Sequence, residues 1–320
     1  MKFIENVIGE ELKTFEKKFK ESMRTSTPLL DSIMKYIIKR KGKQIRPMFV
    51  FLTAKLNGEI NESTYRAASL VELLHTATLV HDDVVDDAAE RRGFFSINAI
   101  WKNKIAVLVG DYLLSRGLLL ATSHEDFQHL HILSEAVQQM SEGELLQMEK
   151  SRKLNLDEAV YFEIIKNKTA SLLSSACAIG TYSTSKDNSL SEKMKTFGEK
   201  VGIAFQIKDD LFDYGKEKIG KPTGNDIKEK KLTLPLIYTL NHCGKNTRKR
   251  LIYILKNENK NPESVRFVLT KVEEHGGIAY AEQIMETYKK EALDILLSYP
   301  DSPVRNALEE LVIYSTARKY

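Results

Sequence analysis

The chain carries two copies of the pattern Asp-Asp-x-x-Asp, one in each half. The acids are, in order, Asp82, Asp83, Asp86, Asp209, Asp210 and Asp213. Residues three and four apart share one face of a helix, so each copy projects carboxylates together. Clustered carboxylates repel one another, and their hard oxygen atoms suit Mg²⁺ that carries substrate phosphates. The sequence therefore predicts a magnesium-dependent diphosphate site.

Basic residues lie close to the first copy. Arg91 and Arg92 follow the acids, and His75 precedes Asp82 by seven residues, which is two helical turns. Guanidinium groups fork around phosphate oxygens, so arginines beside metal-binding carboxylates fit a diphosphate. A single copy of the pattern also describes an ordinary solvated helix end. Two copies, each near basic residues, favour the diphosphate site.

Three further basic segments fit the same chemistry. The string 42–47 places Lys43 and Arg46 beside a helix start, where backbone N–H groups add positive field. A glycine-bounded loop at 220–226, with lysines after it, can fold over a phosphate or can be an ordinary surface loop. Lys168 lies in an otherwise apolar segment, where it either extends to solvent or contacts a phosphate.

Long helices are expected to position these residues. No proline occurs between residues 48 and 221, and apolar residues recur at spacings of three and four, as at Leu70, Leu73, Leu74 and Ala77. We expect an all-α fold, a single large helical bundle of roughly ten or more helices without a substantial sheet. No shift in composition marks a boundary, so residues 1–320 are expected to form one domain.

Some helix ends can be predicted. Asp157 opens a helix expected to run to about Gly180, with Gly180 as its C-cap. Asn261, followed by Pro262 in the first turn, starts another helix.

Composition narrows the class of protein. The net charge of +4 and the scattered lysines and arginines give no sign of nucleic-acid binding. Cys177 and Cys243 are unpaired in sequence, which fits free thiols in a reducing compartment. The sequence shows neither the apolar run of a signal peptide nor an uninterrupted apolar stretch of membrane-spanning length. We expect a cytoplasmic protein with no transmembrane segment.

These motifs resemble those of the polyprenyl synthetase family of trans-isoprenyl diphosphate synthases. The resemblance covers nearly the whole chain, in the family's order and spacing, at 42–47, 75–93, 98–114, 141–144, 168–169, 205–213 and 220–235. It implies the all-α isoprenoid synthase fold around a central cavity, a homodimer, and Mg²⁺, with three ions bound together with diphosphate. The implied substrates are isopentenyl diphosphate and an allylic diphosphate.

The resemblance also implies a role for each matching residue. Asp82, Asp86 and Asp209 would bind Mg²⁺, and Asp83, Asp210 and Asp213 would complete or support those shells. The residues implied for the allylic diphosphate are Arg91, Lys168, Lys221 and, near its reacting end, Thr169 and Gln206. Those implied for isopentenyl diphosphate are Lys43, Arg46, His75 and Arg92. The family commonly has Glu-Gly-Lys where this chain has Glu229, Lys230 and Lys231, and Lys231 is taken as the matching lysine.

Product length is expected to depend on the residues below the first acids. Short-chain members of the family often carry a bulky residue there, whereas Ala77 and Thr78 are small and Leu74 lies one turn further down. Burying each added CH₂ gains about 0.8 kcal/mol, so an open tunnel favours growth. We expect a hexaprenyl or longer product, with octaprenyl as the central value, destined for a quinone side chain. A membrane contact is expected to help its release.

Three other functions are considered. One is a synthase that makes the shorter geranylgeranyl or farnesyl diphosphate, and another is the catalytic subunit of a heteromeric polyprenyl synthase. A terpene cyclase shares the fold and the first motif. Its second motif is typically Asn/Asp-Asp-x-x-Ser/Thr-x-x-x-Glu, which the sequence at 209–213 does not match.

Overall fold

The computed structural model of the chain describes residues 1–40, 42–91, 93–153, 157–215 and 224–317. The expected site residues Arg92 and Lys221 lie outside these ranges. The helices are α1 (Lys2–Ser22), α2 (Pro28–Lys39), α3 (Ile45–Asn57), α4 (Glu62–Val85), α5 (Ile97–Thr122), α6 (Phe127–Lys153), α7 (Glu158–Ile165), α8 (Ser171–Ser185), α9 (Asn188–Phe212), α10 (Asn225–Lys228), α11 (Leu234–His242), α12 (Lys245–Tyr253), α13 (Pro262–Glu274), α14 (Gly277–Leu297) and α15 (Pro303–Thr316).

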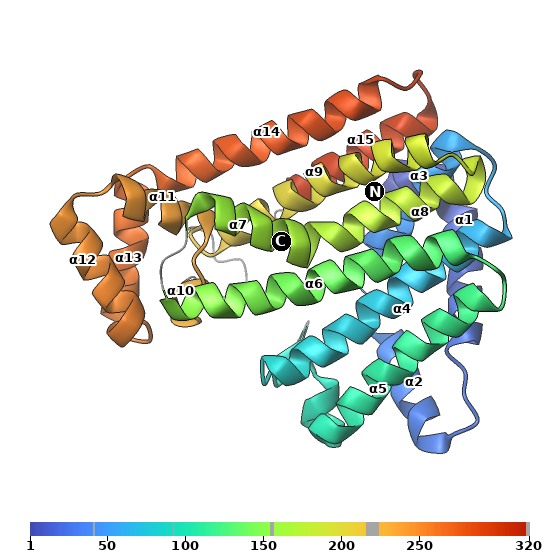
Figure 1. Cartoon of the computed structure of the whole chain (residues 1–320), viewed down its shortest axis with the longest axis horizontal. Helices are drawn as coiled ribbons and strands as arrows, with labels where there is room; N and C mark the ends of the chain where they lie inside the picture. Colours follow the sequence, from blue (N-terminus) through green and yellow to red (C-terminus); the bar gives the residue numbers. More distant parts are fainter. Residues whose placement is uncertain (41, 92, 154–156, 216–223, 318–320) are drawn as a thin grey trace. The chain divides into compact units, whose positions relative to one another are not determined.

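The remaining regular structure is small. Two π-helical segments, η1 (Lys166–Ala170) and η2 (Ile254–Glu258), join neighbouring helices. One antiparallel hairpin of two-residue strands, β1 (Glu90–Arg91) and β2 (Phe94–Phe95), follows α4. The all-α prediction is confirmed (Figure 1).

The described residues group into two compact units. The first comprises Met1–Val137, Ser175–Lys195 and Asp301–Leu308, and the second comprises Gln138–Ser174, Thr196–Pro300 and Glu309–Tyr320. The first aspartate motif belongs to the first unit and the second motif to the second unit. The expected single domain over 1–320 remains a prediction.

In the first unit, α4 packs along α5 and α3, and Figure 1 shows α4 and α5 side by side. Small residues permit the close approach of α4 and α5. A Cβ atom at Gly110 of α5 would lie 2.1 Å from His81 Nε2, and one at Gly117 would lie 3.7 Å from a methyl group of Leu70. The close packing of α5 and α3 against α4 holds the helix that carries the first motif.

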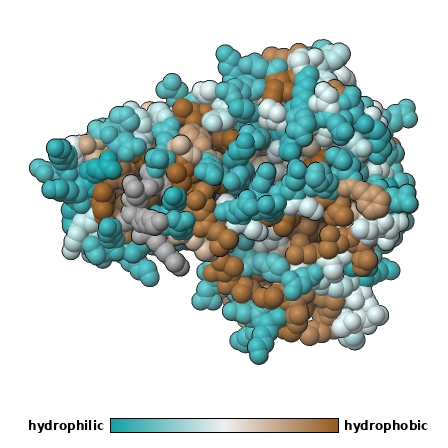
Figure 2. Space-filling model, in the orientation of Figure 1, coloured by the Kyte–Doolittle hydropathy of each residue, from teal (hydrophilic) through white to brown (hydrophobic). Residues whose placement is uncertain are grey.

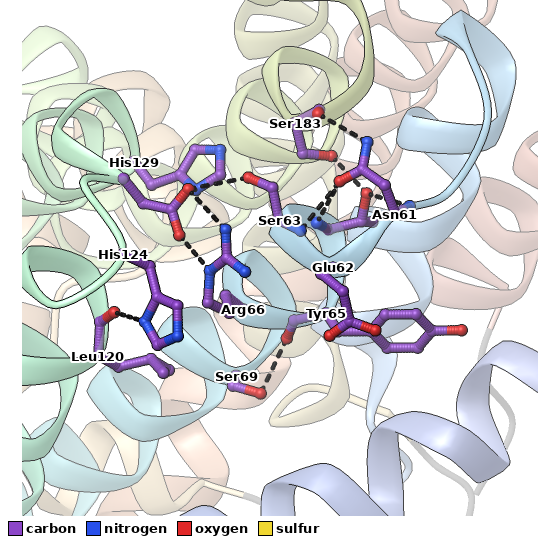
Figure 3. Close-up of polar contacts among 12 residues, drawn as sticks. Asn61, Glu62, Ser63, Tyr65, Arg66, Ser69, Leu120, His124, His129 and Ser183 are labelled. Carbon is purple, nitrogen blue, oxygen red and sulfur yellow. Dashed lines mark hydrogen bonds and ion pairs between the residues drawn. The ribbon is translucent and has the colours of Figure 1, made fainter.

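A polar cluster fixes the other end of α4 (Figure 3). The Asn61 side chain accepts hydrogen bonds from the backbone N–H groups of Ser63 and Thr64, and the Thr64 hydroxyl completes a capping box. Arg66 forms an ion pair with Asp126, which precedes α6. Because a capped helix start resists fraying, the whole of α4 is held from its first turn.

The predicted helix ends are partly correct. Asp157 caps α7 by accepting from Val160 N–H at 2.8 Å, and Asn261 caps α13. The prediction of a C-cap at Gly180 is wrong, since α8 continues to Ser185. Gly180 is instead a packing residue, because a Cβ atom there would come within 2.4 Å of the Val50 carbonyl oxygen.

In the second unit, α9 forms a buried apolar core with α11, α13 and α14. Figure 1 shows α14 as the long red helix, and it packs against α11 and α13. Ile207, just before the second motif, and Leu211, within it, contribute to this core. Because Ile207 and Leu211 are four residues apart, they share the buried face of α9, and this orientation determines which acids of the motif remain at the surface.

The sequence was expected to contain no stretch of membrane-spanning length, but α5 meets the criteria of length and hydropathy for such a span. It is the one described helix that is long and apolar enough to cross a bilayer, with a mean hydropathy of 1.5 over its most apolar window, one third of which is buried. Asp111 and Arg116 interrupt its apolar sequence. Each charge would cost about 3 kcal/mol at the centre of a membrane helix, so length and composition alone are weak support for a span.

Candidate active site

The first aspartate motif ends a helix. Asp82 and Asp83 occupy the last turn of α4, and Asp86 is its C-cap. This last turn holds no basic residue, although the negative end of the helix dipole disfavours acids. Asp83 is buried with 3% of its surface exposed, Asp82 is half-buried and Asp86 is exposed. A divalent cation at Asp82 and Asp86 would relieve both the mutual repulsion and the dipole effect.

The second motif repeats this arrangement at the end of α9. Asp209 and Asp210 lie in the last turn, again without a basic residue, and Asp213 follows it. Asp209 is exposed, whereas Asp210 retains 6% of its surface. In both copies the second acid of the pair is therefore buried and the first retains exposed surface.

Asp210 is held by a hydrogen-bond network. Its carboxylate accepts from Tyr161 Oη at 2.7 Å and from Gln206 Nε2 at 2.9 Å. Burial raises the pKa of Asp210 to about 6, and these two hydrogen bonds oppose the rise. Gln206 also accepts from Thr169 Oγ1 at 2.8 Å, so Thr169 belongs to the same network. Asp210 supports the geometry of α9, and Asp209 is the acid left available to a metal ion.

Asp213 positions the segment that follows the lysine loop. Its two carboxylate oxygens accept from the backbone N–H groups of Asn225, at 2.8 Å, and Asp226, at 3.1 Å. Burial raises its pKa, and these backbone hydrogen bonds oppose the rise. Asp213 thus ties the end of α9 to α10.

Lys168 lies in the π-helical segment η1. It forms an ion pair with Glu144 and donates to Gln147 Oε1 at 3.3 Å, and its side chain is 31% exposed. Single π-helical turns are frequent at functional sites. Lys168 is therefore held at the surface of the second unit by a carboxylate and an amide oxygen.

Arg46 and His75 meet in the first unit. Arg46 Nη1 lies 2.9 Å from His75 Nε2, joining the start of α3 to the middle of α4. Lys43 is exposed in the segment before α3, and Gln44 has a left-handed backbone with φ of 53°. The structure thus brings together Arg46 and His75, two of the residues expected to hold isopentenyl diphosphate.

Lys230 explains the departure from the family pattern. Its φ is +59°, the left-handed conformation that glycine adopts at the least cost. Its Nζ atom donates to the Lys256 carbonyl oxygen at 3.0 Å, and the neighbouring Lys231 pairs with Glu229 at 2.6 Å. The loop therefore keeps the conformation that a glycine would take, despite the lysine.

The other expected residues are less fully defined. Arg91 belongs to β1, and its side chain lies outside the described part of the structure, as do Arg92 and Lys221. Ala77 has no exposed surface, while Thr78 and Leu74 are half-buried. The chain-length role of these three residues remains a prediction.

The donor atoms of the two motifs fit magnesium. The acids with exposed surface, Asp82, Asp86 and Asp209, offer hard carboxylate oxygens, which Mg²⁺ prefers to nitrogen or sulfur. Within the described ranges, no three His, Cys, Asp or Glu side chains form a ready-made metal cluster. Since Mg²⁺ usually keeps waters and binds one or two carboxylates plus phosphate oxygens, the exposed carboxylates that either motif offers by itself are sufficient.

Sequence reasoning missed two residues of the second motif's surroundings. Tyr161 is fully buried and donates to Asp210. Asp226 is half-buried beside Asp210 and Asp213, and burial, followed by their charges, raises its pKa to about 7. Asp226 was visible as an acid at the end of the lysine loop. Nothing in the sequence pairs Tyr161 with an aspartate 49 residues away.

Comparison with known proteins defines the family. The model of the family described as polyprenyl synthetase matches residues 27–272. The chain belongs to the polyprenyl synthetase family. It is 30% identical over 316 residues to heptaprenyl diphosphate synthase component 2 of Bacillus subtilis, covering 98% of this chain and 89% of the relative.

Two solved structures of the family are also similar. A polyprenyl synthase from Caulobacter crescentus, complexed with calcium and isoprenyl diphosphate, matches with a TM-score of 0.91 and 31% identity over 100% of this chain and 98% of the other. A geranylgeranyl pyrophosphate synthase from Bacteroides thetaiotaomicron matches with a TM-score of 0.83 and 37% identity, covering 99% and 98%. The fold and the reaction class are thus those of prenyltransferases.

Proposed function

We propose that this chain is an all-trans polyprenyl diphosphate synthase. It condenses isopentenyl diphosphate head to tail onto an allylic diphosphate in a reaction that depends on Mg²⁺. The observation that carries the proposal is the repeated motif geometry. In both copies a helix ends in acids and has no basic residue in its own last turn, the second acid is buried, and the first retains exposed surface.

Asp82, Asp86 and Asp209 are proposed to hold magnesium, three ions in all with the bound diphosphate. The calcium and isoprenyl diphosphate bound in the similar Caulobacter structure support a divalent ion of this kind. Bound magnesium supplies electrostatic stabilisation of the charge that develops on the departing diphosphate. Asp83, Asp210 and Asp213 keep the helix ends in position, as the hydrogen bonds of Asp210 and Asp213 support.

Lys168 is proposed to transfer from Glu144 to the allylic diphosphate, which Arg91 and Lys221 are also proposed to contact. Exchange of one anionic partner for another keeps the ammonium group paired throughout, so the desolvation cost of binding is small. Thr169 and Gln206, joined at 2.8 Å, are proposed to face the reacting end. Lys231, on the segment tied to Asp213 through α10, would contribute a further cation.

Arg46 and His75 are proposed to anchor isopentenyl diphosphate together with Lys43 and Arg92. The contact of 2.9 Å between Arg46 and His75 supports a shared substrate. The double bond of isopentenyl diphosphate attacks the allylic carbon as the carbon–oxygen bond to diphosphate breaks. The proton then lost passes to the departing diphosphate, so His75 acts as an anchor and needs no acid–base role.

The product is proposed to be a long chain, hexaprenyl or longer, with octaprenyl favoured. The heptaprenyl synthase component among the relatives supports this length. The small side chains of Ala77 and Thr78 support it as well. Geranylgeranyl diphosphate is the second candidate product, because a synthase of that name is 37% identical to this chain.

A homodimer is proposed from the surface of α5. Val107, Leu108, Leu118 and Leu119 are each at least 41% exposed, and Figure 2 shows hydrophobic surface over this helix. An exposed apolar face of this kind marks a protein–protein or membrane contact. A second copy of this chain is proposed to cover this face of α5. The enzyme is also proposed to be cytoplasmic. A membrane contact is proposed only for the release of the product.

Product sizing tests the proposed function. Purified single chain is incubated with labelled isopentenyl diphosphate, Mg²⁺, and geranyl, farnesyl or geranylgeranyl diphosphate as primer. We expect products of six or more isoprene units, and no condensation once divalent ions are removed. A farnesyl or geranylgeranyl main product would refute the long-chain assignment. Activity only after a second protein is added would support the heteromeric alternative, and a hydrocarbon from the allylic diphosphate alone would indicate a cyclase.

A matched set of variants tests the metal assignment. Removing one preorganised electrostatic group from an active site typically costs about 10²–10³ in rate, so Asp82→Asn and Asp209→Asn are each expected to lose that much. Asp87→Asn is the control. Asp87 is exposed next to the motif with φ of 50°, a conformation that asparagine also tolerates, and the control should retain its activity.

A further inference from the structure

A pocket of the first unit borders the site described above, since His75 and Asp83 are among its lining residues. It lies between α1, α2, α4 and the β1–β2 hairpin and is partly open to solvent. All of its described lining residues belong to one compact unit, so the pocket is defined by that unit alone.

The walls of the pocket are mostly apolar. Phe19 of α1, Ile37 of α2 and Leu79 of α4 line it, and Phe94 and Phe95 of the hairpin contribute from β2. Phe94 and Phe95 are 48% and 61% exposed. Two neighbouring exposed phenylalanines beside an apolar cavity are costly in water unless a ligand covers them.

One cation of the pocket has an unused hydrogen-bond donor. Arg40 lies between two rings, with its guanidinium carbon 3.4 Å from the Tyr36 centroid and 4.3 Å from that of Phe94. Its Nη1 atom is buried and has no hydrogen-bond partner among the described residues. A buried donor without an acceptor costs about 1–3 kcal/mol, which a ligand oxygen would recover.

The carboxylates in the lining do not fill this role. Glu16, Glu72 and Asp83 line the pocket, and each has interactions of its own. The pocket therefore combines an apolar cavity, aromatic groups at its edge and one guanidinium nitrogen that lacks an acceptor. Its chemistry matches an amphiphile with a hydrocarbon chain and an anionic head group.

We propose that this pocket is a second, non-catalytic binding site for a prenyl diphosphate. The isoprenoid chain lies against Phe19 and Leu79, and a phosphate oxygen accepts from Arg40. The choice of ligand rests on the proposed function, which makes prenyl diphosphates the amphiphiles of this enzyme. Gln44 and His75 also line the pocket, and His75 contacts Arg46. A bound prenyl diphosphate therefore displaces the residues that anchor isopentenyl diphosphate and weakens its binding.

The chain contains its own reporter for the pocket. Trp101 is the single tryptophan, and its ring packs edge-on against the Tyr36 ring at 5.0 Å between centroids. Farnesyl diphosphate is titrated with a chelator present, because removal of divalent ions suppresses binding at the acid motifs. We expect saturable quenching of Trp101 fluorescence, with farnesol binding at least about tenfold more weakly because it lacks the charged acceptor.

Two variants localise the binding. Arg40→Met keeps an apolar side chain against Tyr36 but removes the donor, and is expected to weaken binding about tenfold or more. Lys39→Met is the matched control, since Lys39 is the exposed neighbour that does not line the pocket. Excess farnesyl diphosphate should raise the KM for isopentenyl diphosphate to a plateau in the wild type and in Lys39→Met. In Arg40→Met it should have little effect on this KM. The kcat should be the same in all three proteins.

Several results would overturn the proposal. They are a silent Trp101 signal, equal binding of farnesol and farnesyl diphosphate, or equal effects of the two variants. An unlimited rise in the KM would also overturn it, because mutual exclusion would place the ligand in the isopentenyl diphosphate site itself. In each case condensation activity would persist, whereas failure of the proposed function would abolish condensation.

Discussion

His129 is expected to make the first unit sensitive to acid. It lies on α6 with 1% of its surface exposed, and neither ring nitrogen has a hydrogen-bond partner among the described residues. Asp126 Oδ1 is 3.7 Å from its Nδ1 atom, near the Arg66 guanidinium shown in Figure 3. Burial lowers the pKa of His129 to about 4, although the Asp126 charge opposes the shift.

The sign of the effect follows from this direction. The folded protein holds His129 neutral, whereas the unfolded chain protonates it below its ordinary value of 6.5. The stabilisation is complete above that value and is lost as the pH falls toward the folded pKa. With about 1.4 kcal/mol per pKa unit, the loss between about pH 7.5 and about pH 5 is about 2 kcal/mol.

Denaturant unfolding at the two pH values measures this loss. His129→Leu replaces the imidazole by an apolar side chain of similar bulk and should abolish this pH dependence. His131→Gln is the control, since His131 is 66% exposed on the same helix. Asp210 and Asp226 act in the opposite direction, because their raised pKa values favour the folded state at low pH. The informative quantity is therefore the difference between wild type and variant.

One result would refute this reasoning. If wild type and His129→Leu lose the same free energy of unfolding between the two pH values, His129 is not held neutral in the folded state. A difference that appears equally in His131→Gln would assign the effect to the helix as a whole.

Three further predictions concern backbone and packing. Lys230→Gly should raise the free energy of unfolding by about 0.5–1 kcal/mol, because relief of the left-handed backbone strain exceeds the loss of the exposed hydrogen bond to Lys256. Lower stability of the variant in denaturant would contradict this. Ala77→Phe should shorten the product on chromatography and destabilise the protein by about 1–3 kcal/mol, because Ala77 is fully buried; an unchanged product would place the chain-length wall elsewhere. Gly110→Ala should lower the melting temperature and kcat together, because its new methyl group would lie 2.1 Å from His81, next to the first motif; a wild-type melting temperature would argue against the close contact.

Much of the fold was predictable from local patterns. Apolar spacing and the lack of proline over 48–221 indicated helices, and the all-α prediction is confirmed. Helix starts at Asp157 and Asn261 were predictable because a cap is a local interaction. The prediction at Gly180 failed because a glycine that ends a helix and a glycine that permits close packing look alike in sequence.

The sequence by itself determined the chemistry. Residue types and spacing are enough to specify carboxylates for magnesium, arginines and lysines for phosphate, and the family that combines them. Helical periodicity places the acids of one copy on neighbouring positions of a helix, since that geometry depends only on the backbone.

Tertiary structure decided which of those acids is available. Asp210 is buried and accepts a hydrogen bond from Tyr161, which is distant in sequence, and Asp213 accepts hydrogen bonds from the backbone of α10. The lone donor of Arg40 likewise arises only where α2 meets the hairpin. Burial and long-range hydrogen bonding depend on neighbours brought together by folding, and no spacing rule within one helix contains that information.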